Sequence, residues 1–117
     1  MRIEGEVYAA DAARRSARAT AHVRLQDVSR ADAAATTVAE VQLDDVAVPA
    51  DKALVVPFTL DVDDAQLDPR ASYIVAVHID LTGSGDVTSG DYITMQSVPA
   101  PLGADPARVE VPVRAVQ

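Results

Sequence analysis

Apolar and polar residues alternate along several short segments of this 117-residue chain, and this alternation constrains its fold more than any other feature. The clearest case is a run in which small or aliphatic residues alternate with polar ones: Ala21, His22, Val23, Arg24, Leu25 and Gln26. A period of two predicts a β-strand with one face buried and the other in water. Leu25 is therefore expected in the core and Arg24 at the surface.

A polar segment after this run predicts where the strand ends. Beyond Asp27 and Val28 the alternation gives way to residues 29–32, Ser-Arg-Ala-Asp. Ser and Asp side chains hydrogen-bond to nearby backbone groups and stabilise turns. We expect the strand to end near Val28, with Leu25 and Asp27 serving the structure.

Six further segments are predicted as strands, and turn signals separate them. They are residues 2–8, 33–43, 53–60, 73–81, 92–98 and 108–116. Asp44 and Asp45 are expected to end the third strand of the chain, and the segment 73–81 is expected to be the longest. Short strands with turns about every ten residues, and no long helical pattern, favour an all-β sandwich of seven to eight antiparallel strands, in one domain spanning residues 1–117.

An alanine-rich stretch at residues 9–20 interrupts the strand pattern. It has no large apolar stripe that could dock a helix, so we expect a loop with at most one helical turn, capped by Asp11. Arg14, Arg15 and Arg18 make it locally basic. A solvated loop is the favoured interpretation, and a patch for an acidic partner is the alternative.

Prolines mark two predicted strands as edges or bulges. Pro57 and Pro112 each remove a backbone donor that a central strand needs. An edge strand has unpaired backbone groups that can receive a strand from a partner, although Pro57 could instead serve to prevent such pairing. The candidate partner-binding residues on these two strands are Val56, Phe58, Leu60, Val109, Val111 and Val113.

Acidic residues are concentrated in the segment from Asp61 to Asp68, which raises a calcium site as one interpretation. The segment lacks the glycine and the closing glutamate of an EF-hand loop. We favour a short helical turn capped by Asp63 or Asp64, with Leu67 packed on the core. Pro69 would end that turn.

Tyr73 follows this segment in the spacing of a tyrosine corner, in which a tyrosine hydroxyl bonds to backbone a few residues upstream. We therefore expect Tyr73 and Pro69 to be structural. We expect the same of Phe58. His78 lies on the strand face opposite to Tyr73, which we expect to be in water, together with Asp80. This pair suggests a hydrolase only weakly, because no Gly-x-Ser-x-Gly elbow accompanies it.

Composition excludes several classes of function. The net charge of −8 argues against nucleic-acid binding, and the few aromatic residues cannot form a base-stacking platform. The chain has no cysteine, hence no disulfide and no thiolate metal site. No apolar run approaches the roughly 20 residues of a membrane helix. We expect no catalytic residue, no cofactor and no bound metal.

Three motifs in order resemble the YbaY/YscW-like family of bacterial lipoproteins, which is related to type III secretion pilotins. They are Leu25–Ala33, Pro57–Leu60 (Pro-Phe-Thr-Leu) and Leu67–Val75 (Leu-Asp-Pro-Arg-Ala-Ser-Tyr-Ile-Val). The resemblance implies an immunoglobulin- or transthyretin-like sandwich without enzymatic activity. It also implies a protein partner, such as a secretin or another envelope protein.

The resemblance further implies a place in the periplasm or at the outer membrane. The chain as written shows neither a signal peptide nor a lipidated cysteine, so a cytoplasmic location is the other expectation. The predicted function is a protein-interaction module that assists assembly or localisation of an envelope or secretion component. The alternative is a sandwich that binds a ligand or calcium through residues 61–68.

Overall fold

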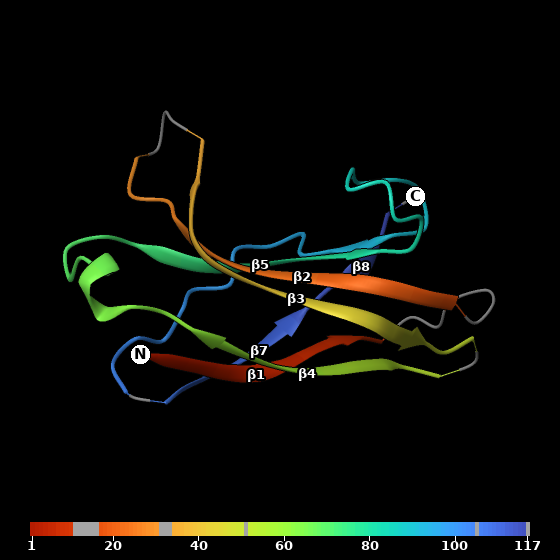
Figure 1. Cartoon of the computed structure of the whole chain (residues 1–117), viewed down its shortest axis with the longest axis horizontal. Coiled ribbons are helices and arrows are strands. Elements are labelled where there is room, and N and C mark those ends of the chain that lie inside the picture. Colours follow the sequence, from red (N-terminus) through yellow and green to blue (C-terminus); the bar gives the residue numbers. More distant parts are fainter. Residues whose placement is uncertain (11–16, 31–33, 51, 105, 117) are drawn as a thin grey trace.

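Two β-sheets stack face to face in the computed structural model, which describes residues 1–10, 17–30, 34–50, 52–104 and 106–116 (Figure 1). The three-stranded sheet has the order β4-β1-β7, with β4 (Leu54–Asp61), β1 (Arg2–Ala9) and β7 (Ala107–Pro112). The five-stranded sheet has the order β3-β2-β5-β6-β8, with β3 (Thr36–Val48), β2 (Ala17–Asp27), β5 (Tyr73–Asp80), β6 (Tyr92–Ile93) and β8 (Arg114–Ala115). The predicted all-β sandwich is confirmed.

The core lies between the sheets and follows the predicted alternation. In β4, every second residue is buried: Leu54, Val56, Phe58 and Leu60. In β2 and β5 the same pattern buries Ala21, Val23, Leu25, Val75, Val77 and Ile79. Because both sheets turn one face inward, their apolar faces pack against each other and exclude water.

One strand pair departs from the antiparallel expectation. β7 runs parallel to β1, with Gly5 opposite Val109. All the other strand pairs of the described residues are antiparallel. A parallel pair needs a long crossover connection, and β1 and β7 lie at opposite ends of the chain, so no hairpin restricts their relative direction.

The longest strand is β3, with 13 residues, and not the predicted segment 73–81. Asp44 and Asp45 do not end it. The register moves from Ala21 opposite Leu43 to Ala19 opposite Val46, so both aspartates lie opposite Thr20 alone. This is a β-bulge, and Asp45 has φ of 56°, a value that Asp tolerates better than most residues.

The alanine-rich stretch contributes to β2. Residues 17–20 are strand, and residues 17–19 pair with β3, so the expected loop is wrong for this part. Arg18 donates to the carbonyl of Asp45. The predicted helical turn, Asp11, Arg14 and Arg15 lie outside the described residues.

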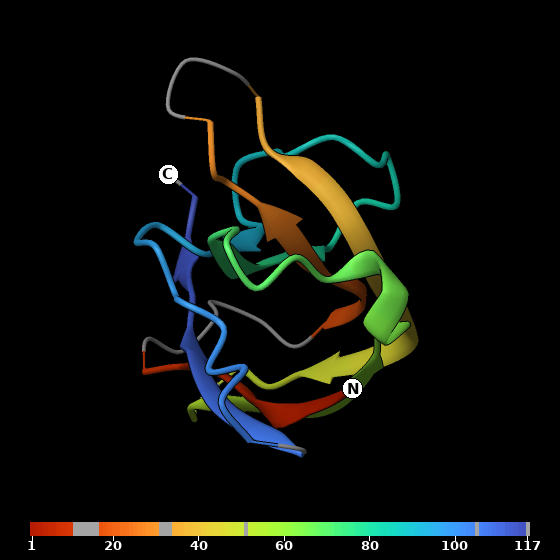
Figure 2. The ribbon, with the colours of Figure 1, turned by 90° about the vertical axis from the view of Figure 1, so that its left-hand side faces the viewer.

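The C-terminal strands are shorter than expected because the chain changes sheets. The predicted strand 92–98 is regular only in β6, although Val98 continues along β5 by accepting from the backbone N–H of Val75. The predicted strand 108–116 divides into β7 and β8. Figure 2 shows this last segment passing from the three-stranded sheet to the five-stranded sheet, and the division falls after Pro112.

Candidate functional site

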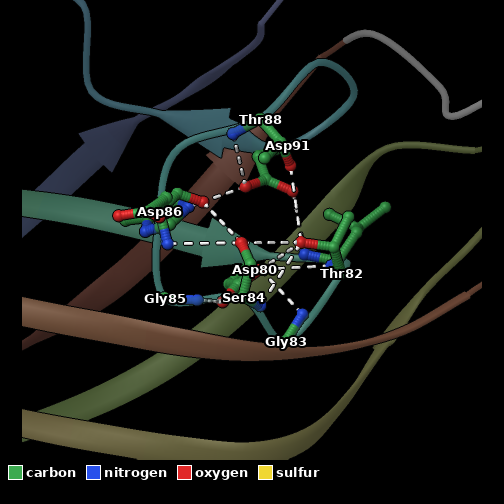
Figure 3. A network of polar contacts seen from close by, with 10 residues as sticks. Asp80, Thr82, Gly83, Ser84, Gly85, Asp86, Thr88 and Asp91 are labelled. Carbon is green, nitrogen blue, oxygen red and sulfur yellow. Dashed lines mark hydrogen bonds and ion pairs between the residues drawn. The ribbon is translucent and has the colours of Figure 1, made fainter.

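The candidate site is the loop of residues 81–91, which connects β5 to β6 on the outer side of the five-stranded sheet. Asp80 is the last residue of β5 and Asp91 immediately precedes β6. Both are buried, with 3% and 0% of their surface exposed. The two buried carboxylates lie beside an exposed glycine-containing loop and form a network of polar contacts with it (Figure 3).

The carboxylate of Asp80 organises the first half of the loop. Its Oδ1 accepts hydrogen bonds from the backbone N–H groups of Thr82 (3.1 Å) and Gly83 (2.9 Å), and from the Thr82 hydroxyl (3.2 Å). Its Oδ2 accepts from the N–H of Gly85 (2.9 Å). Gly83 and Gly85 have φ of 75° and 82°, the region that glycine occupies without strain.

The carboxylate of Asp91 connects the start of the loop, its second half and the sheet. Its Oδ1 accepts from the N–H of Leu81 (2.9 Å), and its Oδ2 accepts from the N–H of Thr88 (3.1 Å). The same Oδ2 lies 2.8 Å from Nε2 of His78. Because an ionised carboxylate can only accept, His78 is the donor in this contact.

Both carboxyl groups have a pKa below their ordinary value. Burial alone would raise each pKa, since it disfavours the charged form. For Asp80, the N–H groups of Gly85, Gly83 and Thr82 together outweigh burial and lower the pKa. For Asp91, the contact with His78 and the N–H groups of Leu81 and Thr88 do the same.

His78 is not in water, which corrects the expectation from its alternation. It lies on the outward face of β5 as predicted, opposite His22 of β2, but it is only 6% exposed because Asp91 and its loop fold against it. The two imidazole rings stack with their centroids 6.0 Å apart. Nδ1 of His22 is buried without a hydrogen-bond partner among the described residues.

His78 and Asp80 lie close together as expected, with ligand atoms within 4.8 Å of each other, but the side chain of His78 bonds to Asp91. The sequence interpretation missed Asp91 and Thr88. A signal was present: oxygen-bearing side chains occupy every second position from Asp80 to Ser84, and the spacing continues to Thr88. The described contacts of His78 include no serine, threonine or cysteine nucleophile.

The acidic segment 61–68 forms the predicted capped turn. Asp63 accepts from the N–H of Ala65 at 3.0 Å and caps a 3-10 helix of residues 64–66. Asp64 pairs with the N-terminal amine at 2.9 Å, and Asp61 pairs with Arg2. Each of these carboxylates has a separate partner, and within the described residues they do not converge on one point.

Five of the candidate partner-binding residues lie on β4 and β7, the edge strands of the three-stranded sheet, and Val113 follows β7. Most of their side chains face the core. Five of the six are at most 6% exposed: Val56, Phe58, Leu60, Val111 and Val113. Val109 is half-buried. A partner at these edges would therefore meet backbone groups and the outward side chains between these residues.

The remaining residues singled out from the sequence have structural surroundings. Leu25 is fully buried. Asp27 accepts from the N–H of Ser29 at 2.9 Å, and hydrogen bonds to Ser29 lower the pKa of this carboxyl group. The hydroxyl of Tyr73 accepts from the N–H of Asp68 at 2.8 Å, which is the bond of a tyrosine corner.

A protein-family model matches most of this chain. Residues 1–99 match the sequence model of the type III secretion system lipoprotein chaperone (YscW) family. The chain belongs to the YscW family. No curated protein sequence matches it. The three motifs that suggested the YscW family all lie within the matched residues.

A solved structure shares the fold of this YscW-family chain. It is an alternative pilotin from the type II secretion system of Vibrio cholerae, with 23% sequence identity and a TM-score of 0.71. The alignment covers 100% of this chain and 97% of the pilotin chain. Among the described residues, no helix is long and apolar enough to cross a membrane.

Proposed function

We propose that this protein is a non-enzymatic interaction module that assists assembly or localisation of a secretion-system or other envelope component. The observation that carries the proposal is the match of residues 1–99 to a family described as lipoprotein chaperones of type III secretion. The fold shared with a pilotin is consistent with it. The partner would be a protein, such as a secretin.

The capture surface that we propose is the β4 edge of the three-stranded sheet. β4 is paired only with β1, and its other side has no strand partner in the described sheet. Two exposed apolar side chains lie next to each other on the outer face, Val55 (56% exposed) on β4 and Tyr8 (39% exposed) on β1. Backbone pairing and this apolar contact would together hold an extended segment of the partner.

Pro57 lies at the centre of β4 and limits how such a segment could pair. It offers no backbone donor, so pairing would rely on the residues on either side of it. If Pro57 serves to prevent strand addition, the β4 edge will not bind, and the β7 edge is the remaining candidate in this sheet.

The test is capture of envelope proteins by the tagged chain from membrane and soluble fractions of the native cell, followed by mass spectrometry. We expect a secretion or outer-membrane component in the membrane fraction. The variant Val55→Lys places a charge on the β4 edge and should abolish capture. It should change the free energy of unfolding by less than about 1 kcal/mol, as surface substitutions usually do.

Val87→Lys is the matched control, because Val87 is similarly exposed (52%) and lies in the loop on the other sheet. It should leave capture unchanged. Capture that survives both in the single variant Val55→Lys and in the double variant with Val55→Lys and Thr59→Lys would show that the β4 edge is not the capture surface. Failure of the wild-type chain to capture any envelope component would contradict the proposed function itself.

A further inference from the structure

The 12 residues from Asp80 to Asp91 have the ligand spacing of a calcium-binding loop. Such loops carry oxygen ligands at positions 1, 3, 5, 7, 9 and 12, with glycine at position 6 and a backbone carbonyl at position 7. Counted from Asp80, those positions hold Asp80, Thr82, Ser84, Asp86, Thr88 and Asp91, with Gly85 at position 6. The departures are hydroxyls at positions 3 and 5 and a shorter carboxylate at position 12.

The fold brings the oxygens of positions 1, 3, 5, 7 and 9 together. Figure 3 shows them gathered around Asp80. The separations are 3.2 Å from Thr82 Oγ1 to Asp80 Oδ1, 3.0 Å from Thr82 Oγ1 to Ser84 Oγ, 3.1 Å from Ser84 Oγ to the Asp86 carbonyl, and 3.5 Å from Thr82 Oγ1 to Thr88 Oγ1. Oxygens that share one calcium ion also lie roughly 3 to 3.5 Å apart, since each is 2.3–2.6 Å from the ion.

Hydrogen bonding alone does not account for all of these contacts. Four oxygen–oxygen contacts are made, but Thr82, Ser84 and Thr88 provide only one hydroxyl hydrogen each. The hydroxyl oxygens therefore keep lone pairs that no hydrogen of these groups fills, and such lone pairs can coordinate a cation.

Charge points to a cation independently of the ligand spacing. Asp80 and Asp91 are buried, and one oxygen of each lies within 4.8 Å of the other and of a His78 nitrogen. Among the described residues, neither carboxylate pairs with a lysine or an arginine, and His78 is the only basic group in contact with either. Backbone N–H groups stabilise both carboxylates, and the cluster as a whole still carries net negative charge, which favours a cation.

We propose that residues 80–91 bind a calcium ion through side-chain oxygens of Asp80, Thr82, Ser84, Thr88 and Asp91 and the backbone carbonyl of Asp86. An all-oxygen set favours calcium over zinc, and calcium accepts irregular coordination, whereas magnesium demands octahedral geometry. His78 is a positioning residue that orients Asp91. With two carboxylates, the dissociation constant should be about 10⁻⁴ to 10⁻³ M.

This inference does not depend on the proposed function. It also differs from the expectation of no metal and from the alternative site at residues 61–68. The bound ion would brace the loop on the outer face of the five-stranded sheet.

The test uses the full chain, freed of metal with a chelator, at constant ionic strength. Calcium chloride up to about 10 mM should raise the melting temperature in a saturable way, and magnesium chloride should raise it much less. Terbium binding should give luminescence on tyrosine excitation, because Tyr92 directly follows Asp91 and the chain has no tryptophan. Calcium should displace the terbium.

Thr82→Val removes one ligand oxygen with little change in shape and keeps the backbone N–H that binds Asp80. It should weaken calcium binding about tenfold or more. Calcium titration measures this at a temperature where the chelator-treated variant is folded. Thr59→Val, an exposed position on β4, and Asp63→Asn, in the other acidic segment, are the matched controls and should bind calcium like the wild type. A wild-type chain that shows neither a rise in melting temperature nor terbium luminescence overturns the proposal, and so does unchanged binding by Thr82→Val.

Discussion

A single hydroxyl, that of Tyr73, joins the start of β5 to the turn before it. The ring is buried among core residues, and the hydroxyl accepts from the backbone N–H of Asp68. The bond connects the five-stranded sheet to the segment that arrives from β4 in the other sheet. A side chain that is both buried and bonded in this way restricts the chain where it passes between sheets.

Tyr73→Phe should keep the packing and remove only this hydrogen bond. We expect a loss of about 1 kcal/mol in the free energy of unfolding, the usual net value of one such bond. Chemical denaturation measures it. Tyr8→Phe is the matched control, since Tyr8 is 39% exposed, and should change stability by less than about 0.5 kcal/mol. Equal effects of the two substitutions would contradict a special role for the Tyr73 hydroxyl.

Asp80 and Asp91 predict how stability depends on pH. Their pKa values are lower in the folded chain than the ordinary value of 3.8, so the unfolded chain takes up protons first as the pH falls. Their contribution is fully present well above pH 3.8 and is lost as the pH falls through the folded values. Unfolding should therefore become easier below about pH 4.

The variant Asp91→Asn isolates this effect, because it removes one of the two titrating groups. It should be less stable than the wild type at neutral pH by about 2 kcal/mol, since hydrogen bonds to a charged group are lost. The difference should shrink on acidification, as measured by denaturant titrations from pH 7 to about pH 3. A constant difference across this range would show that Asp91 does not act through its charge.

At the scale of elements, the three-stranded sheet depends on a glycine in its central strand. Gly5 of β1 has Phe58 of β4 on one side and Val109 of β7 on the other. A Cβ atom at this position would lie 1.9 Å from the carbonyl oxygen of Val109 and 3.2 Å from the Phe58 ring. The absent side chain thus allows the close approach of β7, which explains a glycine in a strand interior.

Gly5→Ala should consequently force β7 away from β1. We expect a loss of about 2 to 3 kcal/mol, in the upper part of the range for overpacking, because the obstructing atom is backbone. Gly103→Ala is the control, because a Cβ there meets no atom within 4 Å. Thermal unfolding of both variants measures the difference, and an equally stable Gly5→Ala variant would contradict the close approach.

At the scale of the whole molecule, the two sheets are connected by the chain itself. The chain passes repeatedly between the sheets, for example from β3 into β4 and from β7 into β8, so neither sheet is a continuous piece of sequence. The apolar faces of both sheets form one core. Neither sheet could retain its structure if the other unfolded, because its inner face would be exposed to water.

Unfolding should therefore be a single cooperative transition of one domain. Tyrosine fluorescence and far-ultraviolet circular dichroism should give the same midpoint in a denaturant titration. Two separated transitions would show that the sheets are independent units.

Local patterns predicted much of the fold and little of the candidate site. The alternation in β4 correctly placed Leu54 and Phe58 in the core. The same alternation placed His78 on the outward face, but it could not show that Asp91 and its loop cover that face. A period of two specifies on which face of a strand each side chain lies. Whether another segment covers that face depends on residues elsewhere in the chain.

The sequence by itself determined which strand faces turn toward the core, where glycine allows turns and that a β-sandwich forms, because these properties arise from near neighbours in the chain. Only the tertiary structure decided that β1 and β7 pair in parallel, that Asp45 forms a bulge and that His78 bonds to Asp91. Each of these depends on contacts between distant segments, and many arrangements of such segments satisfy the same local pattern.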